Sequence, residues 1–350
     1  MYETRAGNAK KIKMEKKEIE SEIEDGTNEA AENAGIEALT EDEQEHLLDI
    51  IIESGGLVSV DDGDEIVLTR DGGTIRYTEC NRYQGIPLSK EQAVWMAERI
   101  LFMDTMELGH LDYSFKRVKP VAHDEAAILE NTMMLTIIPI LYGSMPNLGL
   151  YYQSQGGSFP TPTDLMKEGK FEEAKETQEN AKEKMLEDMR YIGKVLAKTG
   201  LDGLNIDTAA AAGDAEFYGV LEAVEYYTQE LGIPVEVGMS TEEVLGMHAE
   251  LEYEGTKLAG ITPHKQGKLL QKAGASIFGP AINVNSEKTF PWNLARAITY
   301  VKKCTEELEI PIHPNMGMSV GGVPVTDTPP VDAVSRAAKA MVEIANIDGI

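Results

Sequence analysis

Side chains suited to proton transfer stand where short apolar runs of this sequence end. Asp207 closes one run, His264 closely follows a second, and His313 lies inside a third. An imidazole titrates near neutral pH and a carboxylate can orient it, so these groups could act together as general acid and base. Each histidine could instead only complete the hydrogen bonds of its loop. Other side chains at the run ends are Tyr142, Thr208, Met239, Asn283, Asn285 and Asn315.

A second group of chemically active side chains lies within residues 104–112. Asp104, Glu107, His110 and Asp112 place carboxylates and an imidazole close together in the chain. Oxygen and imidazole ligands suit hard and borderline metal ions. Acidic surface residues are nevertheless common in so acidic a chain, and nothing in this spacing fixes a coordination geometry. We therefore predict no metal site.

Glycines cluster after the apolar run that contains His313. Gly317, Gly321 and Gly322 could form a nest of backbone N–H groups that holds an anion. No Gly-Lys-Ser/Thr follows, and the spacing differs from that of a dinucleotide fingerprint. A loop between a strand and a helix is the simpler interpretation.

Strands and helices that would position these residues alternate from about residue 130 onward. Parallel strands joined by helical crossovers give this alternation. When such strands form a barrel, the active site lies at their carboxyl ends. One amphipathic helix is indicated by apolar positions between Ala174 and Leu196. The predicted strands are Leu135–Tyr142, Gly203–Asp207, Val235–Met239, Leu258–Ile261, Ser276–Gly279 and Pro311–Asn315.

The strand count predicts an α/β fold, a (β/α)8 barrel of the TIM type that is incomplete at its C-terminus. Ile347–Ile350 repeats the entry Leu201–Leu204 into an earlier strand, so the chain is expected to stop within a seventh strand. An unclosed barrel would leave hydrogen-bonding strand edges exposed. We therefore expect residues 131–350 to form a barrel domain truncated in the seventh strand, within a longer protein.

Residues 1–130 are predicted to form a separate N-terminal segment of helices and a β-hairpin. Residues 1–55 are charged and helical in pattern, with a narrow apolar stripe in Glu41–Ile52. Glu65–Thr69 and Thr74–Tyr77 flank a Gly-Gly pair that suits a tight hairpin turn.

The net charge and the cysteine content indicate which binding partners and which cellular compartment to expect. The net charge of −28, from 32 basic and 60 acidic residues, would repel nucleic acid and anionic membranes. Cys80 and Cys304 are far apart and indicate neither a disulfide framework nor a thiolate zinc site. The sequence shows no signal peptide and no apolar run of the roughly 20 residues that span a bilayer. A cytoplasmic protein is expected.

Four segments resemble one enzyme family. They are residues 104–116 (DTMELGHLDYSFK), 143–152 (GSMPNLGLYY), 292–297 (WNLARA) and 339–345 (KAMVEIA). These segments closely resemble the dimethylamine:corrinoid protein methyltransferases of methanogenic archaea, and the likeness spans all 350 residues.

The resemblance implies methyl transfer from dimethylamine to the Co(I) corrinoid of a cognate corrinoid protein, with release of methylamine, in methanogenesis. The corrinoid would be supplied by this partner, so the chain would bind no cofactor directly. In that family pyrrolysine follows the Asp-Gly-Ile segment and provides the electrophilic imine carbon that captures the amine. Pyrrolysine would thus follow Ile350, and the chain without it is expected to be inactive.

Within this resemblance we assign Asp207, His264, His313 and Glu107 to a supporting shell that manages protons during catalysis. No residue is assigned to a metal or to a bound cofactor. The roles of individual residues in this shell, the preference among methylamines and the oligomeric state, including a homo-oligomer, stay open.

Two other functions stay open as well. The chain could be a catalytically inactive truncated product, or a pyrrolysine-independent barrel methyltransferase of the corrinoid-linked type that uses the histidines alone. The mass of the native protein and the codon after Ile350 separate these possibilities. An amber codon followed by further coding sequence would favour the pyrrolysine enzyme.

Overall fold

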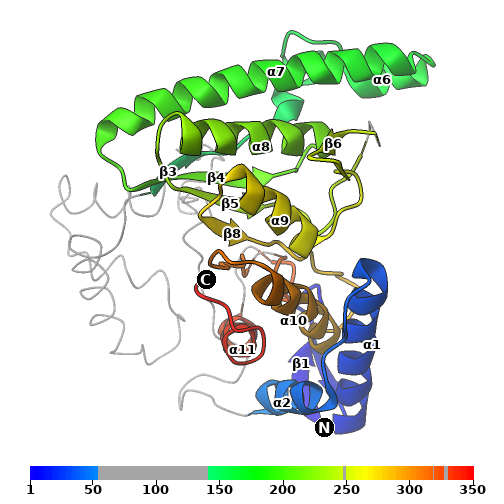
Figure 1. Ribbon diagram of the computed structural model, residues 1–350. Coiled ribbons are helices and arrows are strands. Elements are labelled where there is room, and N and C mark those ends of the chain that lie inside the picture. Colours follow the sequence, from blue (N-terminus) through cyan, green and yellow to red (C-terminus); the bar gives the residue numbers. More distant parts are fainter. Residues whose placement is uncertain (54–140, 247–249, 318, 327–329) are drawn as a thin grey trace, which may run out of the picture.

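A parallel β-sheet with helices packed on one face forms the centre of the molecule (Figure 1). The computed structural model describes residues 1–53, 141–246, 250–317, 319–326 and 330–350. Two short antiparallel hairpins are separate from the central sheet. The strands of the parallel sheet are β3 (Leu141–Ser144), β4 (Gly203–Ala209), β5 (Val235–Met239) and β8 (Ile277–Gly279).

Helices alternate with these strands and cover the sheet from one side (Figure 1). Their ends follow ordinary capping rules: Thr289 accepts a hydrogen bond from the Trp292 N–H, and Gly274 ends its helix in the left-handed conformation. The helices are α6 (Pro162–Lys167), α7 (Phe171–Leu196), α8 (Asp214–Gln229), α9 (Pro263–Ala273), α10 (Phe290–Glu307) and α11 (Val331–Glu343). Short 3-10 helices are η2 (Leu148–Tyr151), η3 (Gln153–Gln155) and η4 (Ala197–Thr199).

Strand neighbours follow one another in chain order, β3-β4-β5-β8, and every pair is parallel. Ile312 extends the sheet beyond β8 through a parallel bridge to Phe278, and the His313 N–H donates to the Phe278 carbonyl at 2.9 Å. At a further position, the Asp348 N–H donates to the Ile312 carbonyl at 3.2 Å. The described chain therefore fills six successive positions at the sheet.

Side-chain alternation divides the sheet into an apolar face and a polar face. Leu204, Ile206, Val235, Val237 and Phe278 are at most 1% exposed, and they lie on the face covered by the helices. Because strand residues alternate between faces, the intervening positions project to the other side. Those positions hold the polar side chains considered below.

The N-terminal segment packs onto the helical layer. It comprises β1 (Tyr2–Arg5), β2 (Lys11–Met14), α1 (Lys16–Ala34) and α2 (Glu41–Ile52). A Cβ atom at Gly26 of α1 would lie 2.3 Å from the Trp292 carbonyl oxygen of α10, so a glycine is needed for this close approach. The hydroxyls of Thr27 and Thr299 are 2.8 Å apart across the same interface. The backbones of α1 and α10 therefore approach each other closely at Gly26 and Trp292.

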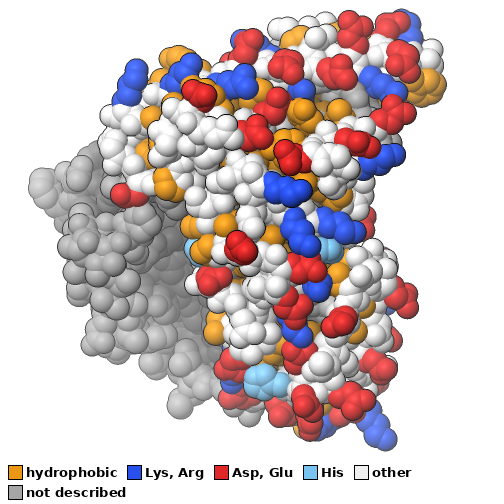
Figure 2. All heavy atoms as spheres, viewed as in Figure 1, with side chains coloured by type: hydrophobic (Ala, Val, Ile, Leu, Met, Phe, Trp, Pro, Cys, Tyr) orange, Lys and Arg blue, Asp and Glu red, His pale blue; other side chains and the backbone are white. Residues whose placement is uncertain are grey.

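Charged side chains of both signs are interspersed over the outer surface of the helices (Figure 2). Acidic groups outnumber basic ones in the sequence, 60 to 32. Spread in this way they keep the surface solvated. No helix in the described part of the chain is long and apolar enough to cross a membrane.

Several predicted elements are confirmed, and two need correction. The strands predicted at Val235–Met239 and Gly203–Asp207 are present, the latter extended by two residues, and the helix predicted over Glu41–Ile52 is present. The charged lead-in is not helical at its start, because residues 2–5 and 11–14 pair as an antiparallel hairpin.

The predicted strand Leu258–Ile261 is wrong. The loop after β5 instead forms the small hairpin of β6 (Glu252–Tyr253) and β7 (Thr256–Lys257), and β5 pairs directly with β8. Leu258 is fully buried and Ile261 nearly so, but they fill the core from a loop that turns at Gly260, whose φ is 77°. Burial produced the apolar run here without any sheet pairing.

Other predictions are met only in part by the described residues. Pro311–Asn315 contributes a single bridge rather than a full strand. The described sheet is open, with no closed barrel. The predicted hairpin at residues 65–77, most of the strand Leu135–Tyr142 and the boundary at residue 130 lie outside the described residues.

Candidate functional site

Polar side chains occupy the sheet face opposite the one on which the described helices pack. Asn205 and Asp207 of β4, Glu236 of β5 and His313 beside β8 take alternate positions with the buried apolar residues, and all four are partly exposed. We call these four residues the inner-face cluster. Two of them, Asp207 and His313, were predicted from the sequence, whereas Asn205 and Glu236 were missed.

Strand register brings three members of the cluster into contact. Asn205 and Glu236 are paired residues of β4 and β5, and the Asn205 side-chain amide donates to Glu236 Oε2 at 3.1 Å. Glu236 Oε1 lies 3.5 Å from Nδ1 of His313, whose side chain is 31% exposed. The carboxylate thus stands between an amide donor and an imidazole. This arrangement can hold the imidazole in one orientation.

Asp207 lies at an irregular point of β4. Its Oδ1 accepts a hydrogen bond from the Thr208 N–H at 2.7 Å, and the pairing of β4 with β5 shifts between Ile206 and Ala209. Thr208 has a φ of 58°, which is rare for a β-branched residue. Strained backbone and strand bulges are frequent at functional sites, where they redirect a side chain.

Glycines make room for the polar groups of the inner face. A Cβ atom on Gly238 would lie 2.8 Å from Asp207 Oδ1. A Cβ atom on Gly349 would lie 2.7 Å from Nε2 of His313. Asp207 therefore lies over Gly238 of the neighbouring strand, and His313 lies over Gly349 of the neighbouring segment. The imidazole contacts the segment that ends at Ile350.

His264 lies apart from the inner-face cluster. It is 6% exposed near the start of α9, and its Nδ1 is 3.4 Å from the Thr262 hydroxyl. Burial lowers its pKa to about 4, against a smaller opposing effect of Glu307. The charged side chains that act on it belong to α9 and the end of α10, so it is a residue of the helical layer. The structure does not bring it together with Asp207 or His313.

Glu107, the fourth predicted site residue, lies outside the described residues, as do Asp104, His110 and Asp112. Among the residues that the structure describes, no group of three or more histidine, cysteine, aspartate or glutamate side chains is arranged to hold a metal ion.

Buried Glu216 fixes the loop that follows β3. This fully buried side chain of α8 accepts hydrogen bonds from the Leu148 N–H at 2.7 Å and the Ala212 N–H at 3.2 Å. Burial raises its pKa, and the backbone donors partly offset that effect. Glu216 thereby ties the loops after β3 and β4 together at the carboxyl edge of the sheet.

Arg296 fixes the loops that follow β5 and β8. Its guanidinium, on α10, pairs with both carboxylate oxygens of Glu242, with Nη1 2.6 Å from Oε2. The Arg296 Nε also donates to Glu29 Oε2 of α1 at 2.5 Å. The Asn283 N–H donates to Glu242 Oε2 at 3.0 Å. Asn283, a residue noted in the sequence, thus serves loop structure.

The glycine loop is also structural. The Gly317 N–H donates to the Val320 carbonyl at 3.2 Å, and the Gly321 N–H donates to the Ile282 carbonyl at 3.0 Å. These donors are therefore engaged within the protein and do not form the anion-binding nest considered from the sequence.

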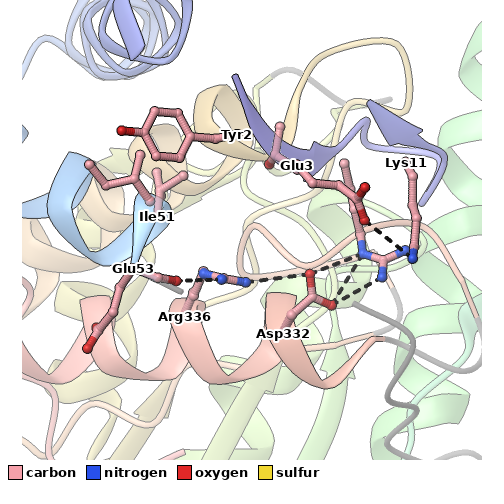
Figure 3. A pocket seen from close by; sticks show the side chains of 10 residues that line it. Tyr2, Glu3, Lys11, Ile51, Glu53, Asp332 and Arg336 are labelled. Carbon is pink, nitrogen blue, oxygen red and sulfur yellow. Dashed lines mark hydrogen bonds and ion pairs between the residues drawn. The ribbon is translucent and has the colours of Figure 1, made fainter. Parts of the chain in front are cut away.

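A small pocket lies among the N-terminal hairpin, α2 and α11 (Figure 3). Its charged side chains pair with one another: Arg5 with Asp332, Lys11 with Glu3, and Arg336 with Asp332 and the Glu53 carbonyl. None of the lining residues belongs to the parallel sheet. The pocket joins the terminal elements and is separate from the inner-face cluster.

A parallel sheet backed by helices, with carboxylates and an imidazole on the face opposite the described helices, is an α/β architecture with groups suited to proton transfer. Comparison with known protein families gives the chemistry: the family described as dimethylamine methyltransferase matches residues 1–350. The chain belongs to the dimethylamine methyltransferase family. This finding agrees with the resemblance seen in the sequence.

Proposed function

We propose that the protein transfers a methyl group from dimethylamine to the Co(I) corrinoid of a partner protein and releases methylamine. The observation that carries this proposal is the family match over the whole chain. The corrinoid belongs to the partner and enters the reaction as the methyl acceptor, so this chain supplies the amine site and needs no cofactor of its own.

We propose that the complete fold is a (β/α)8 barrel. Six sheet positions follow each other in chain order, and the described crossover helices lie on one side of the sheet (Figure 1). Successive right-handed crossovers on one side of a parallel sheet curl it towards closure. The inner-face cluster would then line the barrel, near the carboxyl ends of its strands.

The inner face has the charge that an amine substrate requires. An alkylamine is protonated at neutral pH, as the lysine ammonium is. The carboxylates of Asp207 and Glu236 lie on one sheet face, and the Asp207 carboxylate lies over Gly238, where a Cβ atom would be 2.8 Å from Oδ1. A small secondary ammonium can be held there by charge-assisted hydrogen bonds.

The reaction moves one methyl carbon. The electrons of its bond to nitrogen stay on nitrogen, which leaves as methylamine, and the electron pair of Co(I) forms the new bond. The inner-face cluster would orient the amine so that its methyl group faces the acceptor, and His313 would exchange the amine proton. The electrophile implied by the family resemblance would follow Ile350, and the segment leading to it contacts His313 through Gly349.

The partner would dock at the carboxyl edge of the sheet. The loops after β3 and β5 expose large apolar side chains there: Met145 is 67% exposed, Leu150 58% and Leu245 71%. Exposed apolar groups together on one edge suit a protein interface. The opposite edge of the sheet would then be dispensable for docking.

The test uses the full protein, the reduced corrinoid protein and dimethylamine. Loss of the Co(I) absorbance and appearance of methyl-Co(III) report transfer. We expect Asp207→Asn and His313→Gln to lower kcat by about 10²- to 10⁴-fold, while the surface substitution His46→Gln leaves it unchanged. Transfer from methylamine or methanol in place of dimethylamine would contradict the proposal, as would undiminished activity of both site variants.

A further inference from the structure

We infer that Glu236 is a positioning residue that fixes the tautomer of His313, so that Nδ1 carries the hydrogen and Nε2 exchanges protons with the substrate. The inference rests on the proposed function only for the identity of that substrate, a small alkylammonium. Neither Glu236 nor its partner Asn205 stood out in the sequence.

The carboxylate of Glu236 has one oxygen for each neighbour. The Asn205 amide donates to Oε2 at 3.1 Å, and Oε1 faces Nδ1 of His313 at 3.5 Å. The Glu236 side chain is 18% exposed, so water competes little for these contacts. A distance of 3.5 Å is long for a hydrogen bond, but such contacts often shorten when the substrate binds.

Backbone pairing holds both ends of this contact. Glu236 is registered between Asn205 and Ile277, and the His313 N–H donates to the Phe278 carbonyl at 2.9 Å. A group held by rigid strands keeps its orientation better than a group on a loop. The distance between carboxylate and imidazole is therefore set by the sheet.

The second ring nitrogen faces a different segment. Nε2 is the closest atom to the Cβ position that a side chain at Gly349 would occupy, at 2.7 Å. The Asp348 and Gly349 N–H groups both donate to the Ile312 carbonyl, which places this segment beside His313. Nε2 is thus directed to the sheet position beyond His313, which leads to Ile350.

These contacts select one form of the neutral ring. A neutral imidazole has one nitrogen that donates and one that accepts, and the partner of the first decides the role of the second. The Glu236 carboxylate can only accept, so it favours hydrogen on Nδ1. Nε2 then carries a lone pair, which takes a proton from the ammonium. The amine is left neutral and the ring becomes an imidazolium beside Glu236. The imidazolium returns this proton to nitrogen before or as the C–N bond breaks, so that methylamine leaves and the ring is neutral again.

The experiment observes the ring nitrogens directly. The full protein is labelled with ¹⁵N-histidine, and the His313 signals are assigned with His313→Gln. We expect the Nδ1–H form in the parent protein and loss of that form in Glu236→Ala. Glu243→Gln, an exposed carboxylate on the loop after β5, is the matched control and should leave the spectrum unchanged.

Kinetics gives a second readout. Glu236→Ala should lower kcat by about 10- to 100-fold with KM nearly unchanged. Glu236→Gln should retain part of the wild-type kcat, because its carbonyl oxygen can still accept a hydrogen bond from Nδ1. Should Glu236→Ala fail to fold, two other variants test the same contact. Asn205→Ala removes the amide that holds the Glu236 carboxylate, and Glu236→Gln replaces that carboxylate with an amide. The His313 tautomer is then measured in each variant. An unchanged His313 tautomer in the folded variants overturns the inference. Because the spectra need no corrinoid partner, they fail or succeed independently of the methyl-transfer proposal.

Discussion

Gly349 lies against the imidazole ring of His313, so closely that a Cβ atom at position 349 would be 2.7 Å from Nε2. This contact joins the last described segment of the chain to the inner-face cluster. It also shows why a residue without a side chain is needed there, because any Cβ atom would displace the ring.

Gly349→Ala should therefore disturb the site more than the fold. We expect overpacking to cost about 1–3 kcal/mol of stability, and we expect activity to fall because the ring must rotate away from Glu236. Chemical unfolding and methyl-transfer rates measure the two effects. Gly149→Ala is the control, since its added Cβ would meet only the Asn147 side chain, at 3.1 Å. Wild-type activity in Gly349→Ala would show that the ring position is unimportant.

Gly26→Ala should destabilise the protein although alanine favours helices. In a free helix this change stabilises by about 1 kcal/mol, but here the new methyl group would lie 2.3 Å from the Trp292 carbonyl oxygen. We expect the sign to reverse, with a loss of about 1–3 kcal/mol as α1 separates from α10. Asn28→Ala, on the exposed side of α1, serves as the control. A higher melting temperature for Gly26→Ala would contradict the packing described here.

Arg296→Ala should be among the most damaging single substitutions in the helical layer. It would leave Glu242 without its bidentate partner and remove the link to Glu29. Breaking a buried ion pair costs about 3–5 kcal/mol, and Arg296→Lys should recover only part because lysine cannot form the same fork. Thermal unfolding measures this loss.

A matched comparison for Arg296 is Lys184→Ala. Lys184 is 51% exposed and pairs with Glu187 on the surface of α7, where water and salt screen the pair and its contribution to stability is small. If Arg296→Ala were no more harmful than Lys184→Ala, the guanidinium would not be holding the loops together.

Burial of His264 should make stability depend on pH between about 6.5 and 4. Its pKa is lowered to about 4 in the folded protein, so the unfolded chain binds more protons in this range. Stability therefore falls as pH falls, by up to about 3 kcal/mol for this group. Urea unfolding at a series of pH values measures the slope, which His264→Gln should reduce.

A separate acid-sensitive window belongs to Glu307. Hydrogen bonding to Lys268, followed by Lys303, holds its pKa at about 2, so its contribution is lost only as pH falls below about 4.5. For the His264 prediction, the outcome that contradicts it is an equal dependence of the free energy of unfolding on pH, above pH 5, in wild type and in His264→Gln. The pH dependence would then belong to groups other than His264.

Local patterns in the sequence predicted much of the scaffold. Short apolar runs marked β4 and β5, and the apolar stripe of α2 marked that helix, because both signals arise within a single element. Asp207 and His313 were proposed as site residues because Asp207 closes one apolar run and His313 lies within another. The chain's family was also recognisable from its segments.

Only tertiary structure decided which of these residues meet. Glu236 contacts Asn205 and His313 because of strand register, which depends on how the crossover helices pack and not on any local pattern. Ile261 resembled part of a strand because burial, not pairing, made its run apolar. His264, predicted as a site residue, is buried at the start of α9, a placement that the sequence did not indicate. Sequence determines periodicity and residue chemistry, whereas contacts between distant segments exist only once the sheet has assembled.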